Sequence, residues 1–140
     1  MPRPNELYAY FTITGDFNPK EISARLGLEP TDYWAKGSMH PLNHMERKFS
    51  RWSLYSRLER VRAFEDHILD VLEQLRANAD GFRSVSQEFG GRLELVGYFY
   101  SEYPGLVFGR AQVAAMADFG LEVDFDFYFN YSDRREDTGC

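Results

Sequence analysis

The sequence predicts an α+β fold in which a four-stranded, largely antiparallel sheet carries its helices on one face. Two observations lead to this prediction. Several segments alternate apolar and polar residues, as strands that are buried on one side only do. Between them lie segments whose apolar residues recur with the helical period, so the order is strand, helix, strand, long helix, strand, helix, strand. A ferredoxin-like sheet, or a related β-α-β-α-β-α-β arrangement, accommodates this order.

The first strand and the first helix have clear local signals. Residues 6–14 alternate strictly between the two kinds of side chain, which predicts a half-buried strand. Asn18 is suited to cap the start of a short helix, with Pro19 at its first position. Gly27 predicts where this helix ends, because glycine readily adopts the left-handed conformation of a helix C-terminus.

The middle of the chain contains an irregular stretch and then a long helix. Pro41 argues against regular structure between His40 and His44. Residues 49–56 read as the second strand. From about Glu59 the period becomes helical, with an apolar stripe that consists of Val61, Phe64, Ile68, Val71, Leu72 and Leu75.

The last third of the chain again combines alternating strand segments with a helical segment. Residues 92–100 alternate as a third strand, residues 110–119 form a helix, and residues 121–129 alternate as the clearest strand of all. We therefore expect one domain over residues 1–133, followed by a polar tail over residues 134–140.

Composition narrows the class of protein. The chain has 140 residues, a net charge of −6 and a single cysteine, Cys140, so a cysteine metal cage is excluded. A free thiol, together with no visible signal peptide or long apolar run, predicts a cytoplasmic protein without a membrane partner. The acidic charge argues against a nucleic-acid partner, because such partners are held mainly through their phosphates.

The open face of the predicted sheet is the main candidate site. It is rich in tyrosine, a residue enriched at binding hot spots. The candidate binding residues are Tyr8, Tyr10, Tyr55, Tyr98, Tyr100 and Tyr128. Tyrosine is also a good strand former, so a purely structural role stays open. An RNA-binding sheet is less favoured, because Asp124 and Asp126 share the same face and the Lys/Arg-Gly-aromatic signature is missing.

A second candidate is a basic edge formed by Lys36, Arg47 and Arg51, which would suit an anionic ligand or an acidic partner. Between them, His40 and His44 have a spacing that suits a metal only on a helix. Pro41 makes that helix unfavourable, so these histidines and the Asp124 and Asp126 pair are weak metal candidates only. We expect no metal and no cofactor. Trp34 and Trp52 are expected to pack and so to anchor the two ends of this loop, with the histidines between them facing water.

Several runs of residues, in their order and spacing, resemble one family, the bacterial domain of unknown function 4279. These runs are Gly15-Asp16-Phe17-Asn18-Pro19, Leu26-Gly27-Leu28-Glu29-Pro30-Thr31, Trp34-Ala35-Lys36-Gly37, Phe49-Ser50-Arg51-Trp52-Ser53-Leu54 and Tyr103-Pro104-Gly105-Leu106. The resemblance implies a bacterial, single-domain, cytoplasmic protein. It brings no catalytic residues, because the family has no assigned reaction.

Together these observations favour a non-enzymatic binding module that recognises a protein partner, or a second copy of itself, through the tyrosine-rich sheet face. One concrete form is an immunity-like protein that neutralises a toxin. Two alternatives stay open. One is a small metal-dependent hydrolase that uses Asp124, Asp126 and His40 or His44. The other is a sensor of an anionic ligand bound near Lys36 and Arg51.

Overall fold

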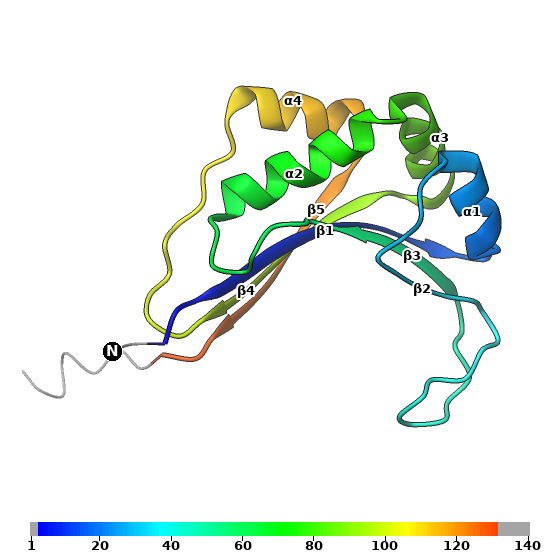
Figure 1. Ribbon diagram of the computed structural model, residues 1–140, viewed down its shortest axis with the longest axis horizontal. Coiled ribbons are helices and arrows are strands. Elements are labelled where there is room, and N and C mark those ends of the chain that lie inside the picture. Colours follow the sequence, from blue (N-terminus) through cyan, green and yellow to red (C-terminus); the bar gives the residue numbers. More distant parts are fainter. Residues whose placement is uncertain (1–2, 132–140) are drawn as a thin grey trace, which may run out of the picture.

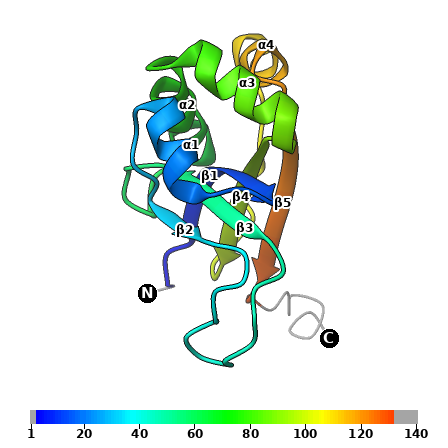
Figure 2. The same ribbon diagram turned by 90° about the vertical axis from the view of Figure 1, so that its right-hand side faces the viewer.

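The computed structural model describes residues 3–131, which form one sheet with all its helices on the same side (Figures 1 and 2). Within these residues the chain contains five strands and four helices. In chain order they are β1 (Glu6–Gly15), α1 (Pro19–Leu26), β2 (Asp32–Trp34), β3 (Ser50–Tyr55), α2 (Phe64–Arg76), α3 (Ala79–Phe89), β4 (Arg92–Phe99), α4 (Arg110–Asp118) and β5 (Glu122–Phe129). The tail expected over residues 134–140 lies outside the described residues.

The sheet is mixed and has the strand order β2-β3-β1-β4-β5. Neighbouring strands are antiparallel except β4 and β5, which are parallel because α4 connects them. The prediction of an α+β fold with helices on one face is confirmed. The prediction of four strands in a largely antiparallel, ferredoxin-like sheet fits only roughly, since the sheet has five strands and a parallel edge. The missed strand, β2, has three residues, too few to show a period.

Helix α1 begins and ends where its sequence signals predict. The Asn18 side-chain oxygen accepts a hydrogen bond from the Lys20 backbone N–H at 3.0 Å. Gly27 has a φ of 70°, the left-handed conformation that favours glycine at a helix C-terminus. Both caps satisfy backbone groups that would otherwise lack partners, so they fix the length of the helix.

Helix α2 starts later than its apolar pattern suggested. Its first residue is Phe64, and Val61, which the pattern placed in the buried stripe, is 62% exposed. The segment before Phe64 is not helical and is bonded to β1 instead. Its backbone is tied to the first strand by a hydrogen bond from the Leu7 N–H to the Arg60 carbonyl oxygen at 2.7 Å.

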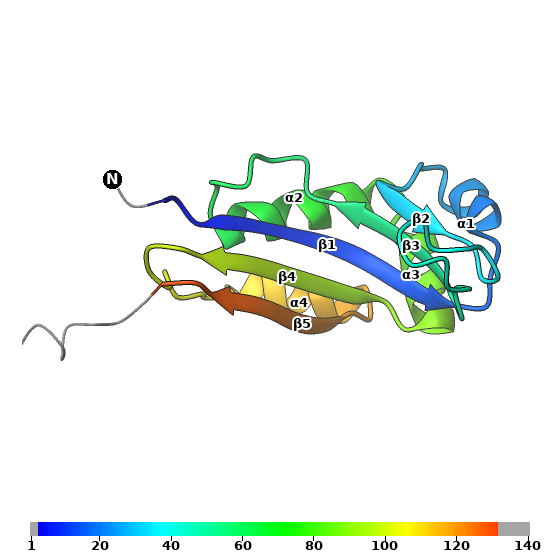
Figure 3. The same cartoon turned by 90° about the horizontal axis from the view of Figure 1, so that it is seen from below.

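The core lies between the sheet and the helices and is mainly aromatic at its centre. Phe11 of β1 meets Phe82 of α3 edge to face, with ring centroids 5.2 Å apart. Trp52 of β3 is fully buried beside them and donates its indole N–H to the Ser23 hydroxyl oxygen at 3.0 Å. The helices cover most of one face of the sheet and only part of β5, and they leave the other face uncovered (Figure 3).

Candidate functional site

The uncovered sheet face is defined by the registers of its strands. Tyr10 of β1 lies opposite Tyr55 of β3 on one side and Glu94 of β4 on the other. Alternation then places a set of polar and aromatic side chains on this open face. They are Trp34 of β2, Arg51, Ser53 and Tyr55 of β3, Tyr8, Tyr10 and Thr12 of β1, Arg92, Glu94 and Tyr98 of β4, and Asp124, Asp126 and Tyr128 of β5.

Three of these residues, Tyr8, Tyr10 and Tyr55, form what we call the tyrosine cluster. The rings of Tyr10 and Tyr55 stack with their centroids 4.4 Å apart and their planes 11° from parallel. Tyr8 extends the stack, with its ring centroid 5.8 Å from that of Tyr55. All three are half-buried. Offset stacking of this kind stabilises aromatic pairs, so the cluster is ordered before any partner binds.

Two arginines lie against the tyrosine cluster. The Arg51 guanidinium carbon is 5.0 Å from the Tyr10 ring centroid, and that of Arg60 is 4.3 Å from the Tyr8 ring centroid. Arg51 also donates a hydrogen bond from Nε to the Ser53 hydroxyl oxygen at 2.9 Å. These cation–π contacts and hydrogen bonds hold the charges close to the rings.

Two phenols of the cluster, those of Tyr8 and Tyr55, stay neutral at physiological pH. Burial, followed by the neighbouring Tyr98, raises the pKa of Tyr8 to about 12. Burial also raises the pKa of Tyr55, against the opposing effect of Arg51. The hydroxyl groups of Tyr8 and Tyr55 therefore act as neutral hydrogen-bond donors and acceptors.

The other three predicted binding tyrosines, Tyr98, Tyr100 and Tyr128, do not all lie on the sheet face. Tyr98 and Tyr128 lie side by side on β4 and β5 and stack with centroids 4.9 Å apart. A hydrogen bond from Tyr128 to Asp126 raises the pKa of the Tyr128 hydroxyl. Tyr100 does not belong to the sheet face, because β4 ends at Phe99. Its backbone N–H instead donates to the Asn5 side-chain oxygen at 2.8 Å.

Glu94 is a residue of this face that the sequence did not single out. It lies between Tyr10 and Asp124 in neighbouring strands and is 8% exposed. Burial, then the neighbouring Asp124 carboxylate, raises the pKa of Glu94, although Arg92 lies 3.4 Å away and opposes the shift. The alternation of residues 92–100 placed Glu94 on this face, but only the pairing of β4 with β5 reveals its second carboxylate neighbour.

Of the three residues of the expected basic edge, Arg47 and Arg51 meet at the Trp34 ring, whereas Lys36 has a different partner. The guanidinium carbons of Arg47 and Arg51 lie 4.6 and 5.2 Å from the Trp34 ring centroid. The Lys36 ammonium instead pairs with Asp16 at 3.2 Å.

Trp34 and Trp52 pack on opposite faces of the sheet, Trp34 beside Phe49 and Trp52 in the core. They lie on neighbouring strands one residue out of step, since Tyr33 is the partner of Trp52. Trp34 therefore points to the open face, whereas Trp52 points into the core.

The two histidines lie in a projecting segment, residues 37–47, that we call the arm (Figure 1). The arm is a short hairpin, in which the Arg47 N–H donates to the Ser38 carbonyl oxygen at 2.8 Å. The Nδ1 of His40 accepts the Leu42 backbone N–H at 3.1 Å. The large apolar side chains of the arm are exposed, namely Met39, Leu42 and Met45.

The weak metal candidates are not brought together. Asp124 and Asp126 lie on β5, whereas the arm with both histidines leads into β3, three strand positions and about 14 Å away across the sheet. Within residues 3–131, no three His, Cys, Asp or Glu side chains are grouped as a metal ion would require.

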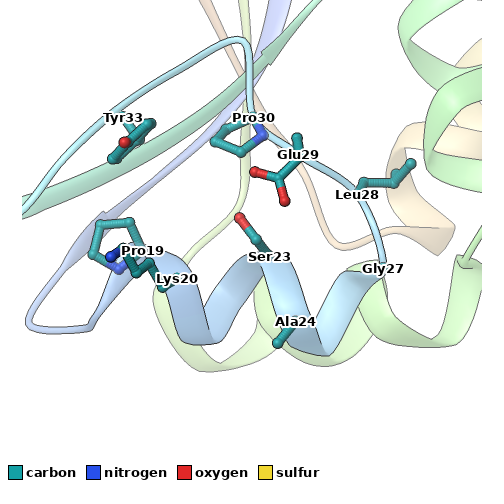
Figure 4. A pocket seen from close by; sticks show the side chains of 9 residues that line it. All are labelled: Pro19, Lys20, Ser23, Ala24, Gly27, Leu28, Glu29, Pro30 and Tyr33. Atoms are coloured by element: carbon teal, nitrogen blue, oxygen red, sulfur yellow. The ribbon is translucent and has the colours of Figure 1, made fainter.

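A groove lies on the other side of the sheet, between α1 and the segment that leads into β2 (Figure 4). Its volume is about 460 Å³, and Pro19, Pro30 and Tyr33 contribute its apolar surface. Lys20 and Glu29 place one charge of each sign at its walls. The groove is separated from the tyrosine cluster by the sheet itself.

These features define an α+β domain whose helices cover one sheet face and whose other face is aromatic and charged. The sequence matches the family described as Domain of unknown function (DUF4279) over residues 5–130, and the chain belongs to that family. No curated protein and no solved structure gives a significant match to the chain. Within residues 3–131, no helix is both long enough and apolar enough to cross a membrane.

Proposed function

We propose that this protein is a non-enzymatic binding module whose recognition surface is the open sheet face around the tyrosine cluster. One observation carries the proposal: three stacked tyrosines, braced by Arg51 and Arg60, lie uncovered on a rigid sheet. Tyrosine and arginine supply much of the binding energy at protein interfaces. Side chains that are already ordered lose little entropy when a partner binds, which favours affinity.

The charge of the face supports a protein partner over a nucleic acid. Glu94, Asp124 and Asp126 lie on the same face as the tyrosines, and the whole chain has a net charge of −6. Phosphates would be repelled by these carboxylates. A protein partner with basic groups beside an apolar patch fits the combination of acids and rings. An immunity-like inhibitor of a basic toxin in a bacterial cytoplasm is one form of this proposal, and a homodimer is another.

The experiment is affinity capture of the chain from the cells that encode it, comparing two pairs of tyrosine substitutions. Tyr10→Ala with Tyr98→Ala removes rings from the open face. Tyr33→Ala with Tyr103→Ala removes two exposed tyrosines that do not lie on that face. We expect a stoichiometric partner or second copy with wild type and with the Tyr33 and Tyr103 variant, and its loss with the Tyr10 and Tyr98 variant. Equal retention by both variants contradicts the proposal.

A second candidate function, the sensing of an anionic ligand, is favoured by one atom. The Nε of Arg47 is buried and has no hydrogen-bond partner within residues 3–131. A buried donor without a partner is unfavourable, and a small anion would satisfy it. Inorganic phosphate should then raise the melting temperature of wild type and of Lys48→Ala, but not of Arg47→Ala. Equal shifts in all of them would rule this candidate out.

A further inference from the structure

Strand β5 has one unoccupied edge. Within residues 3–131, it pairs with β4 on one side and ends the strand order on the other. At eight residues it is longer than a typical protected edge, and Figure 3 shows it running along the border of the sheet. Edge strands of this length can accept an additional strand from another chain.

The hydrogen bonds at both ends of β5 show which backbone groups point outward. The Glu122 N–H donates to the Gly91 carbonyl oxygen, and the Asn130 N–H donates to the Phe99 carbonyl oxygen. Residues of a parallel strand bond alternately to either side, so the even-numbered residues of β5 bond to β4. The backbone groups of Val123, Phe125, Phe127 and Phe129 therefore face the unoccupied edge.

The side chains of β5 differ sharply between its two faces. Glu122, Asp124 and Asp126 lie on the open face. On the helix face, Phe125 and Phe129 are 49% and 56% exposed, whereas the core-facing residues of β1 and β4 are almost fully buried. The helix layer thus covers β5 only in part. An aromatic strip remains exposed along the same edge as the unpaired backbone.

Charge disfavours a second copy of β5 at this edge in the two antiparallel registers that are centred on the middle of the strand. In an antiparallel pair centred on Phe125, Asp124 of one copy would lie opposite Asp126 of the other. Moving the centre to Asp126 would place that residue opposite itself. Like charges directly opposite each other destabilise a strand pair, so these registers are unfavourable. The acids would instead stabilise a strand whose residues at the facing positions are basic.

We infer that the free edge of β5 binds an extended segment of a partner protein, one that alternates basic and apolar residues. Its main-chain groups would pair with those of Phe125 and Phe127. Its basic side chains would lie beside Asp124 and Asp126, and its apolar side chains would cover Phe125 and Phe129. This site goes beyond the proposed function, because it does not use the tyrosine cluster.

The test uses the synthetic peptide Lys-Val-Lys-Val-Lys-Val-Lys-Val and a block peptide of the same composition, Lys-Lys-Lys-Lys-Val-Val-Val-Val. Binding to the full chain is followed by NMR titration and by amide exchange. We expect the alternating peptide to bind about tenfold more tightly than the block peptide and to slow exchange at Val123, Phe125, Phe127 and Phe129. Equal binding of both peptides overturns the inference, because it reports charge attraction alone.

Phe125→Pro and Phe125→Leu form a matched pair of variants. Proline removes the outward N–H but leaves the bonds from β5 to β4 in place, and proline is tolerated at such edge positions. We expect Phe125→Pro to weaken binding about tenfold and Phe125→Leu to leave it within about twofold. Unchanged binding by Phe125→Pro contradicts strand addition.

Asp126→Lys supplies a test that needs no proline. It should weaken binding of the lysine peptide and strengthen binding of Glu-Val-Glu-Val-Glu-Val-Glu-Val, and the absence of that reversal overturns the inference.

The variant with Tyr10→Ala and Tyr98→Ala should still bind the lysine peptide. This result separates the edge of β5 from the tyrosine cluster, so that failure of one proposal is distinct from failure of the other.

Discussion

Tyr10 and Tyr55 face each other across β1 and β3, with ring centroids 4.4 Å apart and planes only 11° from parallel. Cross-strand aromatic pairs of this kind add to the stability of a sheet beyond the area they bury. The pair lies at the centre of the open face, so it links the stability of that face to its proposed use in binding.

A double-mutant cycle should measure this link. We expect Tyr10→Leu and Tyr55→Leu to be coupled by about 0.5–1.5 kcal/mol in the free energy of unfolding. Urea unfolding of wild type, both single variants and the double variant gives the value. The pair Thr14→Ala and Tyr128→Leu, which lie on strands that are not neighbours, serves as the uncoupled control. Additivity at Tyr10 and Tyr55 would show that the stack is not an interacting unit.

Asp70 anchors the segment before α2. It accepts hydrogen bonds from the Arg57 backbone N–H at 2.8 Å, from the Arg57 guanidinium Nη2 at 2.7 Å and from Gln74 Nε2 at 3.1 Å. Burial raises the pKa of Asp70, but the bonds from Arg57 outweigh it and lower that pKa below its ordinary value.

The lowered pKa of Asp70 determines how the stability of the protein depends on pH. The carboxylate stabilises the fold above the ordinary pKa of aspartate, and this stabilisation is lost as the pH falls through the lowered folded-state pKa. Asp70→Asn should therefore lower the free energy of unfolding by about 2 kcal/mol at pH 7. The loss should be smaller below about pH 3. Denaturant midpoints at both pH values check this. A constant difference would show that charge is not the cause.

His67 should make stability fall in mild acid. It is fully buried on α2, its Nδ1 is hydrogen-bonded to the Ser56 hydroxyl, and burial lowers its pKa below the ordinary 6.5 despite the nearby Asp66 and Asp70. As the pH falls, His67 takes up a proton in the unfolded chain at a higher pH than it does in the folded protein. The stabilising contribution of neutral His67 is therefore full above about pH 6.5 and is lost as the pH falls toward the folded-state pKa. Melting temperatures across this window should drop more for wild type than for His67→Gln. Parallel curves for the two proteins would contradict this account.

Gly97 should not tolerate a side chain. It lies on the core face of β4, where an added Cβ would come within 2.6 Å of the Phe99 ring and 3.0 Å of the Phe64 ring. Both rings are closely packed, so Gly97→Ala should destabilise the protein by about 1–3 kcal/mol. Gly105→Ala is the comparison, because an added Cβ at Gly105 would meet no other atom within 4 Å. Any destabilisation by that variant comes from the φ of 79°, which an alanine adopts only with strain. A Gly97→Ala variant as stable as wild type would refute the packing argument.

How far the sequence predicts this molecule depends on the range of the interactions involved. Local signals sufficed for α1, where Asn18 and Gly27 cap the helix, and for the strands with strict alternation. Alternation places Tyr8, Tyr10 and Tyr55 on one face, in agreement with the strand registers, because it determines the side of each residue. The apolar pattern extends α2 too far because Val61 fits the helical period, although the neighbouring Arg60 backbone bonds to Leu7 instead.

The remaining features depend on pairing between distant strands. The proximity of Glu94 to Asp124 requires the parallel pairing of β4 and β5, which no local pattern encodes. The division of Trp34 and Trp52 between opposite faces follows from β2, a strand too short to be recognised by alternation. The exposure of Phe125 and Phe129 depends on how much of β5 the helix layer covers, which the alternating pattern of β5 does not show.

The most direct test of the central claim, that the open tyrosine face binds a protein, is the mass of the chain in solution. Untagged protein purified from the cells that encode it would be measured by size-exclusion chromatography with light scattering, as wild type and as the variant with Tyr10→Ala and Tyr98→Ala. We predict a complex heavier than the 16.3 kDa monomer for wild type and the monomer mass for the variant. A monomeric wild type, or a complex that persists unchanged in the variant, would contradict the account.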